Sequence, residues 1–514
     1  MGEPLGADEA SHFFTKRRFG ILMARIMTRA WYHIVVIGSD LSGLIFAALA
    51  ARAGYRVCVL GQGSEGGRYR HEGHWFLRER ETALGVPVSP AISRVFSELA
   101  LGLELKNRPQ PLDPTMQLAM PGVRLDLARD PRLLERELER EFPGQWSGLE
   151  PLDALAREGA ARFDLLWQGN LGLPPDGFLE RAALRKALRD LDPRGLEPAP
   201  APFAAWLAHP GLAHAAHAIL DHIAGLATQT LPRHVALRLW RAFRDGIYRF
   251  PGGVDGLRQM FVRKLQDQSG HYRADALAIH LDVKRSRAIA VGLAERGEAI
   301  GCEMIVLNGR ADRVAPLLGL AVEAPRAHRA IINLALDPRV IPPAMAPELL
   351  LFGEDDRPRG VAPPPNRVAL PARSWWVSRP GAGPLTSDGR PGPGVLQVST
   401  IVRGHRLEGP EAATARASSL RDEALRALRA VLPWLEDGLR AIDVPEPVPL
   451  HAGLDPETAF SLAEHWPKLP LSNALVTSSG HEAPLGLEGA CHQAMMAFYR
   501  LRRELRIKGS LAHA

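Results

Sequence analysis

The sequence predicts an α/β fold in which a Rossmann-like domain is assembled from discontinuous segments and a second domain combines a mixed sheet with helices. Three observations lead to this prediction. A βαβ pattern lies near the N-terminus, a long helical stretch follows it, and strand patterns then return. Because 514 residues exceed what one hydrophobic core accommodates, we expect two interleaved domains.

The βαβ pattern occupies residues 33–60. The apolar run 33–37 predicts a strand buried on both faces, and the Ala- and Leu-rich run 41–52, closed by Gly54, predicts a helix. The run 56–60 predicts a second strand. This order of elements in so short a segment predicts parallel strands joined by a right-handed crossover.

The remaining chain alternates between helical and strand patterns. Residues 130–245 carry apolar side chains at three- and four-residue spacing, which predicts a helical insertion. Strand patterns at 276–307 predict a return to the first sheet. Residues 356–394 predict a loop and an edge strand of a second sheet, because proline is excluded from central ladders. Further helices are expected at residues 413–440 and 484–507.

These patterns divide the chain into a tail and two domains. Residues 27–130, 246–310 and 470–514 are expected to form the nucleotide-binding domain, and residues 131–245 and 311–469 the substrate-type domain. Residues 1–26 are expected to be a tail, since Met27 is a natural start for the first strand. The alternative is that this basic, Phe-containing segment forms a short amphipathic helix that binds a membrane surface or a partner.

The composition narrows the function and the location. The net charge of +6 is small for this length and the basic residues are interleaved with acidic ones, so nucleic acid is not expected as a partner. The three cysteines are far apart, which favours a reducing, cytoplasmic compartment. No charge-free apolar run reaches the length of a transmembrane helix. The histidines show no ligand spacing, and we assign no metal site.

The turn after the first strand is the first candidate site. In a dinucleotide fold this turn brings a helix N-terminus to the diphosphate, where unpaired N–H groups favour negative charge. Asp40 occupies the middle glycine position of the fingerprint, where a side chain collides with the phosphates and a carboxylate repels them. The alternative role of Asp40 is to cap the helix. The residues of the turn are Gly38, Ser39, Asp40, Leu41, Ser42 and Gly43.

Several further stretches, in their order along the chain, carry a resemblance to a known family. They are Gly66-Gly67-Arg68, L-D-P-T-M-Q-L-A-M-P-G-V-R-L-D-L at 112–127, Y-R-F-P-G-G-V-D-G-L at 248–257, the strand pair from Val283 to Asn308, and the C-terminal runs 473–480 and 484–490. Together with the βαβ unit, this order resembles FAD-dependent amine oxidases and phytoene desaturases over most of residues 32–507. The resemblance implies FAD as the cofactor. It also implies that Gln62, Gly66, Gly67, Arg68, Val283, Gly480, Leu487, Glu488 and Gly489 contact FAD, together with the residues of the first turn.

The resemblance has three departures, and they leave two functions open. Besides Asp40, Gly61 and Gln62 replace the acid that binds the ribose, and Ser478-Ser479 replace an acid near the flavin. One function is an FAD-dependent oxidoreductase that acts on an apolar small molecule, because flavin itself supplies the chemistry. The alternative is a flavin-weak or flavin-free pseudoenzyme that binds a partner, as in the similar Rab GDP-dissociation inhibitors. In that case the glycines serve only tight turns.

Overall fold

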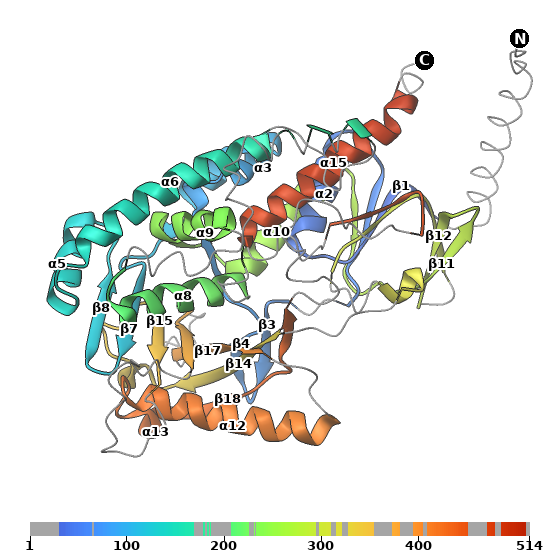
Figure 1. Ribbon diagram of the computed structural model, residues 1–514. Coiled ribbons are helices and arrows are strands. Elements are labelled where there is room, and N and C mark those ends of the chain that lie inside the picture. Colours follow the sequence, from blue (N-terminus) through green and yellow to red (C-terminus); the bar gives the residue numbers. More distant parts are fainter. Residues whose placement is uncertain are drawn as a thin grey trace, which may run out of the picture.

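The computed structural model shows two sheets with helices packed on and between them (Figure 1). The expected tail, residues 1–26, lies outside the part of the chain that the structure describes. The described residues are 30–63, 66–168, 178–179, 182–183, 186, 207–225, 231, 233–294, 298–309, 315–320, 327–353, 373–380, 394–403, 409–450, 470–477 and 485–509.

The first sheet joins segments that are far apart in the sequence. Its order is β10-β2-β1-β13-β12-β11, and β20 pairs with β13. The pairs β10–β2, β2–β1, β1–β13 and β13–β20 are parallel, whereas β11, β12 and β13 form an antiparallel meander. The strands are β1 (Ala30–Ile37), β2 (Val57–Leu60), β10 (His271–Arg273), β11 (Ala278–Lys284), β12 (Arg287–Leu293), β13 (Ala299–Leu307) and β20 (Ala474–Val476).

Helices cover one face of this sheet. The helix α2 (Leu41–Arg52) packs between α10 (Gly253–Asp267) and α15 (Leu487–Gly509), and α15 also contacts α3 (Pro90–Glu98). The residues of α2 from Ser42 to Ala51 are buried, because this helix is apolar on all sides. A 3-10 turn of residues 86–88 precedes α3, and the short helix α4 (Gly102–Asn107) follows it. The start of α2 is therefore held on several sides.

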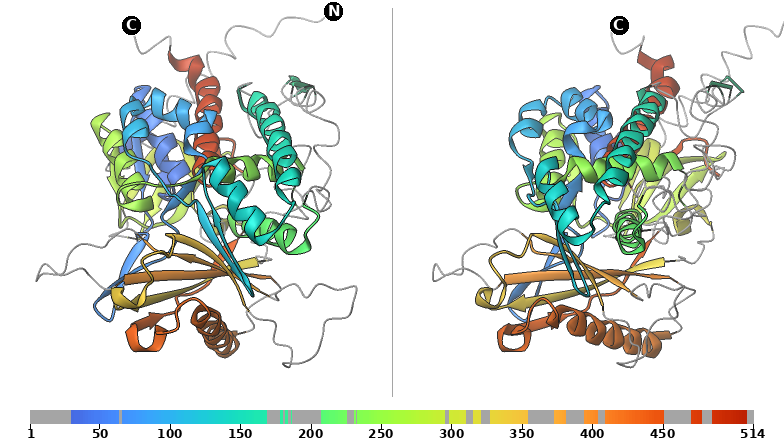
Figure 2. Two further views of the ribbon diagram at one scale, coloured as in Figure 1. Left: turned by 90° about the vertical axis from the view of Figure 1, so that its left-hand side faces the viewer. Right: turned by 60° about the vertical axis from the view of Figure 1, so that its left-hand side comes forward.

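The second sheet lies below the first in Figure 2, with α12 (Gly409–Arg429) under it. Its order is β18-β14-β17-β16-β15-β7-β8, and β19 pairs with β14. Buried aliphatic side chains of β14 and β17 pack against α12 and α13 (Leu435–Gly438). The strands are β7 (Met116–Met120), β8 (Val123–Leu127), β14 (Ala327–Leu336), β15 (Glu348–Phe352), β16 (Ser374–Ser378), β17 (Gly394–Arg403), β18 (Leu439–Asp443) and β19 (Val448–Leu450).

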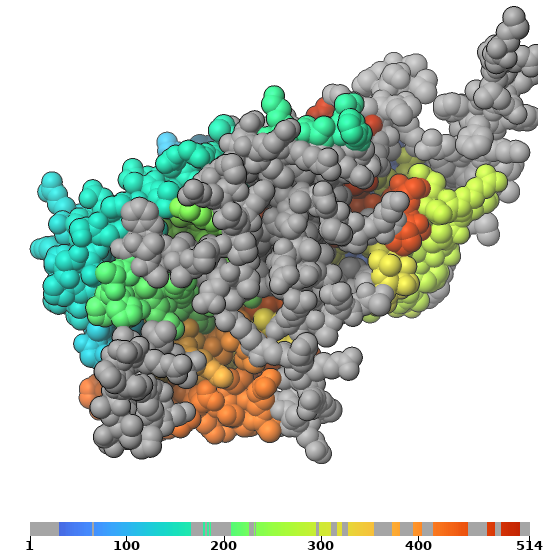
Figure 3. Space-filling view, viewed as in Figure 1, coloured from blue at the N-terminus to red at the C-terminus, as the bar shows by residue number. Residues whose placement is uncertain are grey.

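The helical insertion packs on the other face of the second sheet. One hydrophobic cluster unites its helices with β7, β8, β15 and Trp376 of β16. In the space-filling view of Figure 3 this layer forms the left side of the molecule, above α12. The helices are α5 (Pro131–Glu141), α6 (Trp146–Gln168), α8 (Pro210–Ala224) and α9 (Arg233–Asp245). Two small sheets complete the fold: β3 (Arg68–His71) with β4 (His74–Leu77), and β9 (Ile247–Arg249) between β5 (Thr82–Leu84) and β6 (Gln110–Pro111).

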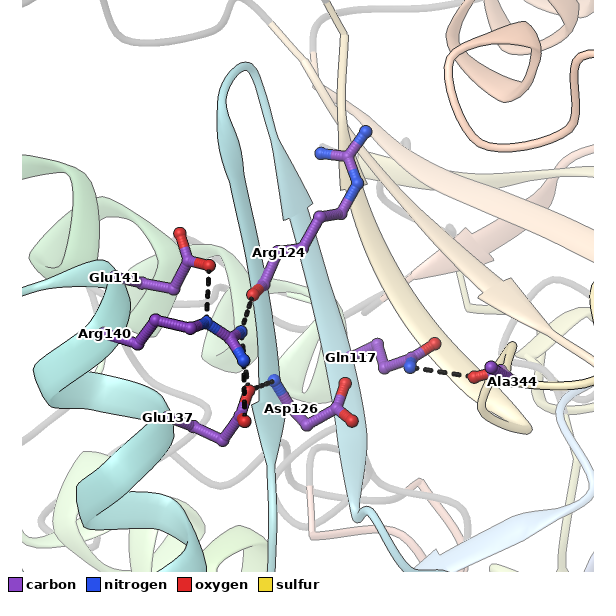
Figure 4. A network of polar contacts seen from close by, with 7 residues as sticks. All are labelled: Gln117, Arg124, Asp126, Glu137, Arg140, Glu141 and Ala344. Atoms are coloured by element: carbon purple, nitrogen blue, oxygen red, sulfur yellow. Dashed lines mark hydrogen bonds and ion pairs between the residues drawn. The ribbon is translucent and has the colours of Figure 1, made fainter.

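Polar contacts fix the β7–β8 hairpin to its neighbours (Figure 4). Arg140 of α5 donates to both carboxylate oxygens of Glu137, at 2.8 and 2.7 Å, and to the backbone oxygen of Arg124 on β8. Glu137 also accepts the backbone N–H of Asp126 at 3.3 Å. On the other side, Gln117 of β7 donates to the Ala344 carbonyl at 3.0 Å. The hairpin is thus an integral edge of the second sheet.

The structure confirms most of the expected elements. The α/β fold class, the βαβ unit, the helical insertion and the return to the first sheet are all present. One prediction is wrong: within 356–394, β16 lies between β15 and β17 and is not an edge strand. The five residues of β16 contain no proline, so the Pro-rich composition of the flanking residues does not exclude a central ladder.

Two further observations concern the expected organisation. The hairpin β7–β8 belongs to the second sheet, although it lies within the segment expected to belong to the nucleotide-binding domain. The boundaries between the two domains stay a prediction. No helix in the described part of the chain is long and apolar enough to cross a membrane.

We expect Gly61→Ala to destabilise the protein more than Gly102→Ala. A Cβ atom at Gly61 would lie 2.3 Å from the Ala274 carbonyl oxygen, whereas one at Gly102 meets nothing within 4 Å. A backbone atom cannot move aside easily, so the cost is about 1–3 kcal/mol, or roughly 2 °C in Tm for a chain of this size. Thermal unfolding of both variants measures the difference. Equal Tm values would show that the loop after β10 adapts freely.

Candidate cofactor region

The glycine turn between β1 and α2 is built around contacts with the protein itself. A Cβ atom at Gly38 would lie 1.6 Å from the Asn308 carbonyl oxygen, and Gly38 has a φ of +111°. A Cβ atom at Gly43 would lie 2.3 Å from the Asn308 side chain. Both glycines are therefore required by the packing of Asn308, whether or not a nucleotide binds. Leu41, the first residue of α2, packs partly buried against the core beneath the turn.

Asn308 follows β13 and connects the turn to a third segment. Its Oδ1 accepts the Asp40 backbone N–H at 2.7 Å. Its Nδ2 donates to Ser42 Oγ at 2.9 Å and to Thr477 Oγ1 at 3.0 Å. Ser42 Oγ in turn donates to the Thr477 carbonyl at 2.6 Å. The hydroxyl of Ser39 lies 3.4 Å from the Gly61 carbonyl, a longer contact.

The end of β2, where an acid would bind a ribose, is closed by the loop after β10. The Gly61 N–H donates to the Arg273 carbonyl at 2.8 Å, and any side chain at Gly61 would collide with Ala274. Gln62 has a φ of 60°, and its N–H donates to the Ala276 carbonyl at 3.1 Å. Its side-chain amide lies 3.4 Å from the same carbonyl. The missing acid thus has a structural cause.

The Gly66-Gly67-Arg68 segment is satisfied by carboxylates of the same chain. Asp255 of α10 accepts the Gly67 N–H at 2.7 Å and lies 3.3 Å from where a Cβ atom of Gly66 would be. Arg68 forms an ion pair with Glu81 at 2.5 Å. An N–H group and a guanidinium that suit a phosphate therefore both bind protein carboxylates.

Three carboxylates surround one guanidinium in front of the α2 N-terminus. Arg258 of α10 donates to Glu79 at 2.5 Å and to Asp255 at 3.3 Å. Burial acts to lower the pKa of Arg258, but Glu79, Asp40 and Asp255 together raise it. Desolvation raises the pKa of Glu79, Arg258 opposes the rise, and Asp40 and Asp255 add to it. A Cβ atom at Gly67 would lie 3.1 Å from Glu79 Oε1 and 3.2 Å from Asp255 Oδ1, so both carboxylates gather beside the Gly67 backbone.

Glu79 also reaches toward the second sheet. Arg329 lies on β14, and Glu79 is the carboxylate whose charge acts on its pKa. About 39% of the Glu79 side chain is accessible, although nearby protein atoms desolvate its carboxylate. Glu79 therefore acts electrostatically on Asp40 at the start of α2 and on Arg329 of β14.

The start of α15 faces the helical insertion. Glu488 accepts hydrogen bonds from Arg238 of α9, a residue with only 1% exposure, and from Ser89 Oγ at 2.8 Å. Arg238 also lies 3.4 Å from Asp164 of α6. Gly489 and Leu487 are buried, and Leu487 joins the core around α2. Glu488 is therefore committed to a buried ion pair that fixes α15 to α9.

Of the remaining candidate residues, Val283 lies away from the glycine turn and Gly480 is not among the described residues. Val283 is on β11 at the far edge of the first sheet, and 52% of it is exposed. The residues that approach the end of β2 are instead Ala274 and Ala276. Gly480 and Ser478-Ser479 lie outside the described residues.

The structure adds residues that sequence reasoning missed: Glu79, Asp255, Arg258, Asn308 and Thr477. A signal existed for Asn308, because a polar residue directly after the buried strand Ala299–Leu307 lies at the edge where parallel strands end. Asp255 lies within the quoted run 248–257, but nothing in that run indicates its partner.

Comparison with known structures identifies the fold. An oxidoreductase from Methanosarcina mazei is 14% identical with a TM-score of 0.55, and the match covers 91% of this chain and 99% of that one. Cyclohexylamine oxidase from Brevibacterium oxydans IH-35A is 13% identical with a TM-score of 0.52, covering 92% and 99%. Wild-type putrescine oxidase bound to putrescine is also 13% identical, with a TM-score of 0.51 and coverage of 92% and 99%.

The chain has the fold of the FAD-dependent amine oxidases. This confirms the family resemblance at the level of the fold. No family model matches the sequence, and no curated protein matches it. The fold is therefore shared at a sequence identity of 13–14% with the structures named above.

The residues around the α2 N-terminus do not fit an FAD diphosphate. A diphosphate is negatively charged and binds where N–H groups and the helix dipole are free to meet it. Here Asp40, Glu79 and Asp255 exceed the one guanidinium of Arg258, and Asp255 occupies the Gly67 N–H. The loop at Gly61 leaves no room for a ribose-binding acid. Turn geometry is retained, but the charge is of the wrong sign.

We expect Asp164→Asn to become more stable, relative to the native chain, as pH rises from about 4 to 7. Burial raises the pKa of Asp164 to about 6, Arg238 opposes this, and Glu488 adds to it. The unfolded chain loses this proton near pH 4, so native stability falls as pH rises toward 6, by about 2 kcal/mol. An asparagine at this position does not titrate, so the stability of the variant does not fall over this pH range.

Unfolding by urea at pH 4.5 and 7.5 measures the effect. Asp422→Asn is the matched control, because Asp422 is an exposed residue of α12 paired only with its neighbour Arg421. An Asp164→Asn difference that is the same at both pH values would contradict the assignment.

Proposed function

We propose that this chain is a ligand-binding protein with the amine-oxidase fold that does not hold FAD at the usual diphosphate position. The observation that carries the proposal is the placement of Glu79. Its carboxylate binds Arg258 in front of α2, close to Asp40 and Asp255, and it extends toward Arg329 of the second sheet. A diphosphate bound in front of α2 would have to lie close to this negative side chain.

Electrostatics give the size of the effect. Two unit charges of the same sign at about 5 Å repel by about 3 kcal/mol at an effective dielectric constant of about 20. Asp40 is exposed, so solvent reduces its share to about 1–2 kcal/mol. Together with the bound Gly67 N–H, the acids reduce affinity for a diphosphate by several orders of magnitude. The fold then serves as a scaffold for another ligand.

An FAD-dependent oxidoreductase that acts on an apolar small molecule is the second candidate. The intact turn at Gly38 and Gly43 and the helix N-terminus of α2 favour it, because both are parts of a dinucleotide site. In that case Arg258 would turn from Glu79 toward the diphosphate. The two candidates differ in whether the purified protein carries flavin.

We expect the protein purified from a flavin-replete host to show no flavin absorbance, and FAD to bind it weakly. Asp40→Gly should bind FAD more tightly by roughly 1–3 kcal/mol, since both a side chain and a negative charge leave the diphosphate position. Asp40→Gly combined with Glu79→Gln should gain more than the single variant. Quenching of flavin fluorescence during titration measures each affinity.

Two control variants test whether the effect on FAD affinity comes from the charge of Asp40, from its volume, or from any loss of a negative charge. Asp40→Asn removes the charge and keeps the volume, and Asp422→Asn removes an equal charge far away on α12. The latter should leave FAD affinity unchanged. A native protein that purifies yellow with one FAD per chain would overturn the proposal in favour of the oxidoreductase.

A further inference from the structure

Two arginines converge on one backbone oxygen beside the second sheet. Arg80, in the connection between β4 and β5, donates to the His222 carbonyl. Arg329 of β14 donates to the same oxygen at 3.1 Å. Because both guanidiniums bond one atom, their positive charges lie within a few ångströms of each other. Both residues are partly buried.

Neighbouring elements hold the two arginines in place. Arg80 stacks on Trp376 of β16, with its guanidinium carbon 4.4 Å from the ring centroid. His222 lies in the last turn of α8, and its ring Nε2 lies 3.0 Å from Ser374 Oγ. Trp376 is 1% exposed and belongs to the core under the helical insertion. The pair is therefore preorganised by β14, β16 and α8.

The carboxylates nearest to the pair are committed to other groups. In the part of the chain that the structure describes, no carboxylate lies within ion-pair distance of Arg80 or Arg329. Glu348 accepts from Trp376 Nε1 at 2.5 Å and from Ser378 Oγ at 2.6 Å. Glu79 is bound to Arg258. Glu348 and Glu79 therefore act on Arg80 and Arg329 only from a distance, and no carboxylate is in direct contact with the pair.

Burial makes the close approach of the Arg80 and Arg329 guanidiniums energetically unfavourable. Burial and the neighbouring Arg329 lower the pKa of Arg80 well below its usual range. Burial lowers the pKa of Arg329 to about 10, and its Nε has no hydrogen-bond partner. Desolvated like charges without an anion cost stability, and guanidiniums bind carboxylate and phosphate oxygens with paired hydrogen bonds.

We propose that Arg80 and Arg329 form the binding site for a small anion that carries a carboxylate or a phosphate group. The anion supplies a counter-charge in direct contact with the pair and accepts the N–H groups that the His222 carbonyl leaves free. Arg249, which donates to the Arg379 carbonyl at 2.7 Å, acts together with Arg80 on Glu348 and adds positive charge to this region. The proposal names the ligand class of the ligand-binding function proposed above and rests on it.

The test is calorimetric titration of the flavin-free protein with sodium phosphate and, separately, with sodium acetate at constant ionic strength. We expect saturable binding of at least one of them. Arg80→Gln and Arg329→Gln should each weaken it by about tenfold or more, the usual effect of losing a charged hydrogen bond. Arg339→Gln, which removes an exposed arginine paired with Asp337, should have no effect. Tighter binding of phosphate or of acetate identifies the group that the site prefers.

A stability measurement separates a binding role from a structural one. Without added anion, Arg329→Gln should be at least as stable as the native chain, because it relieves the like-charge pair and Arg80 still donates to His222. With phosphate, the native Tm should rise and that of the variant should stay constant. Arg329→Lys keeps the charge without the paired donors and should bind with intermediate affinity.

Specific results would overturn the inference. No saturable heat with either anion, or binding that is unchanged in both glutamine variants, would show that the pair is not an anion site. If Arg329→Gln does not fold, Arg80→Gln carries the same test. The readout involves no flavin, so this failure is distinct from finding FAD in the purified protein.

Discussion

A single buried side chain, Asn308, holds together the region on which the rest of the first domain depends. Its amide joins the Asp40 N–H, the Ser42 hydroxyl and the Thr477 hydroxyl, so it connects β1–α2, β13 and β20. These segments are more than 160 residues apart, and no local contact aligns them. A buried amide whose hydrogen bonds are all made fixes one geometry, because any shift leaves a polar group unpaired. Gly38 and Gly43 have no side chains because Asn308 packs against them.

The sequence predicts the elements that local patterns determine, and it does not predict contacts between segments far apart in the chain. The strand of β1 and the helix α2 follow from apolar runs and a glycine turn, and they appear at the expected residues. The position of β16 was missed because proline in neighbouring residues masked a short, proline-free strand. Asp255 and Arg258 are three residues apart on α10 and pair as helix neighbours. Glu79, in the connection after β4, reaches Arg258 only in the folded chain, and no local spacing encodes that contact.

The glycine fingerprint therefore reports on packing more directly than on a cofactor. Gly38, Gly43 and Gly61 each face a protein atom closer than any Cβ tolerates. Selection for the fold alone would retain them. Asp40 is exposed, and its side chain faces the place where a diphosphate would lie in a dinucleotide site. The residue that departs from the fingerprint is the informative one, because function belongs to the site and not to the fold.

Negative charge gathers in front of the first sheet and positive charge beside the second. A dinucleotide places its diphosphate against the first sheet, where positive potential is needed. In this chain Asp40, Glu79 and Asp255 lie there, and Arg80 and Arg329 lie against the second sheet. The polarity of the region is thus opposite to the one that FAD requires. Glu79 stands between the two groups, bound to Arg258 on one side and acting on Arg329 on the other. Because an anion bound by the two arginines would add negative charge on the far side of Glu79, it would further raise the pKa of this carboxylate. Anion binding at the second sheet would therefore be coupled through Glu79 to the charge in front of α2.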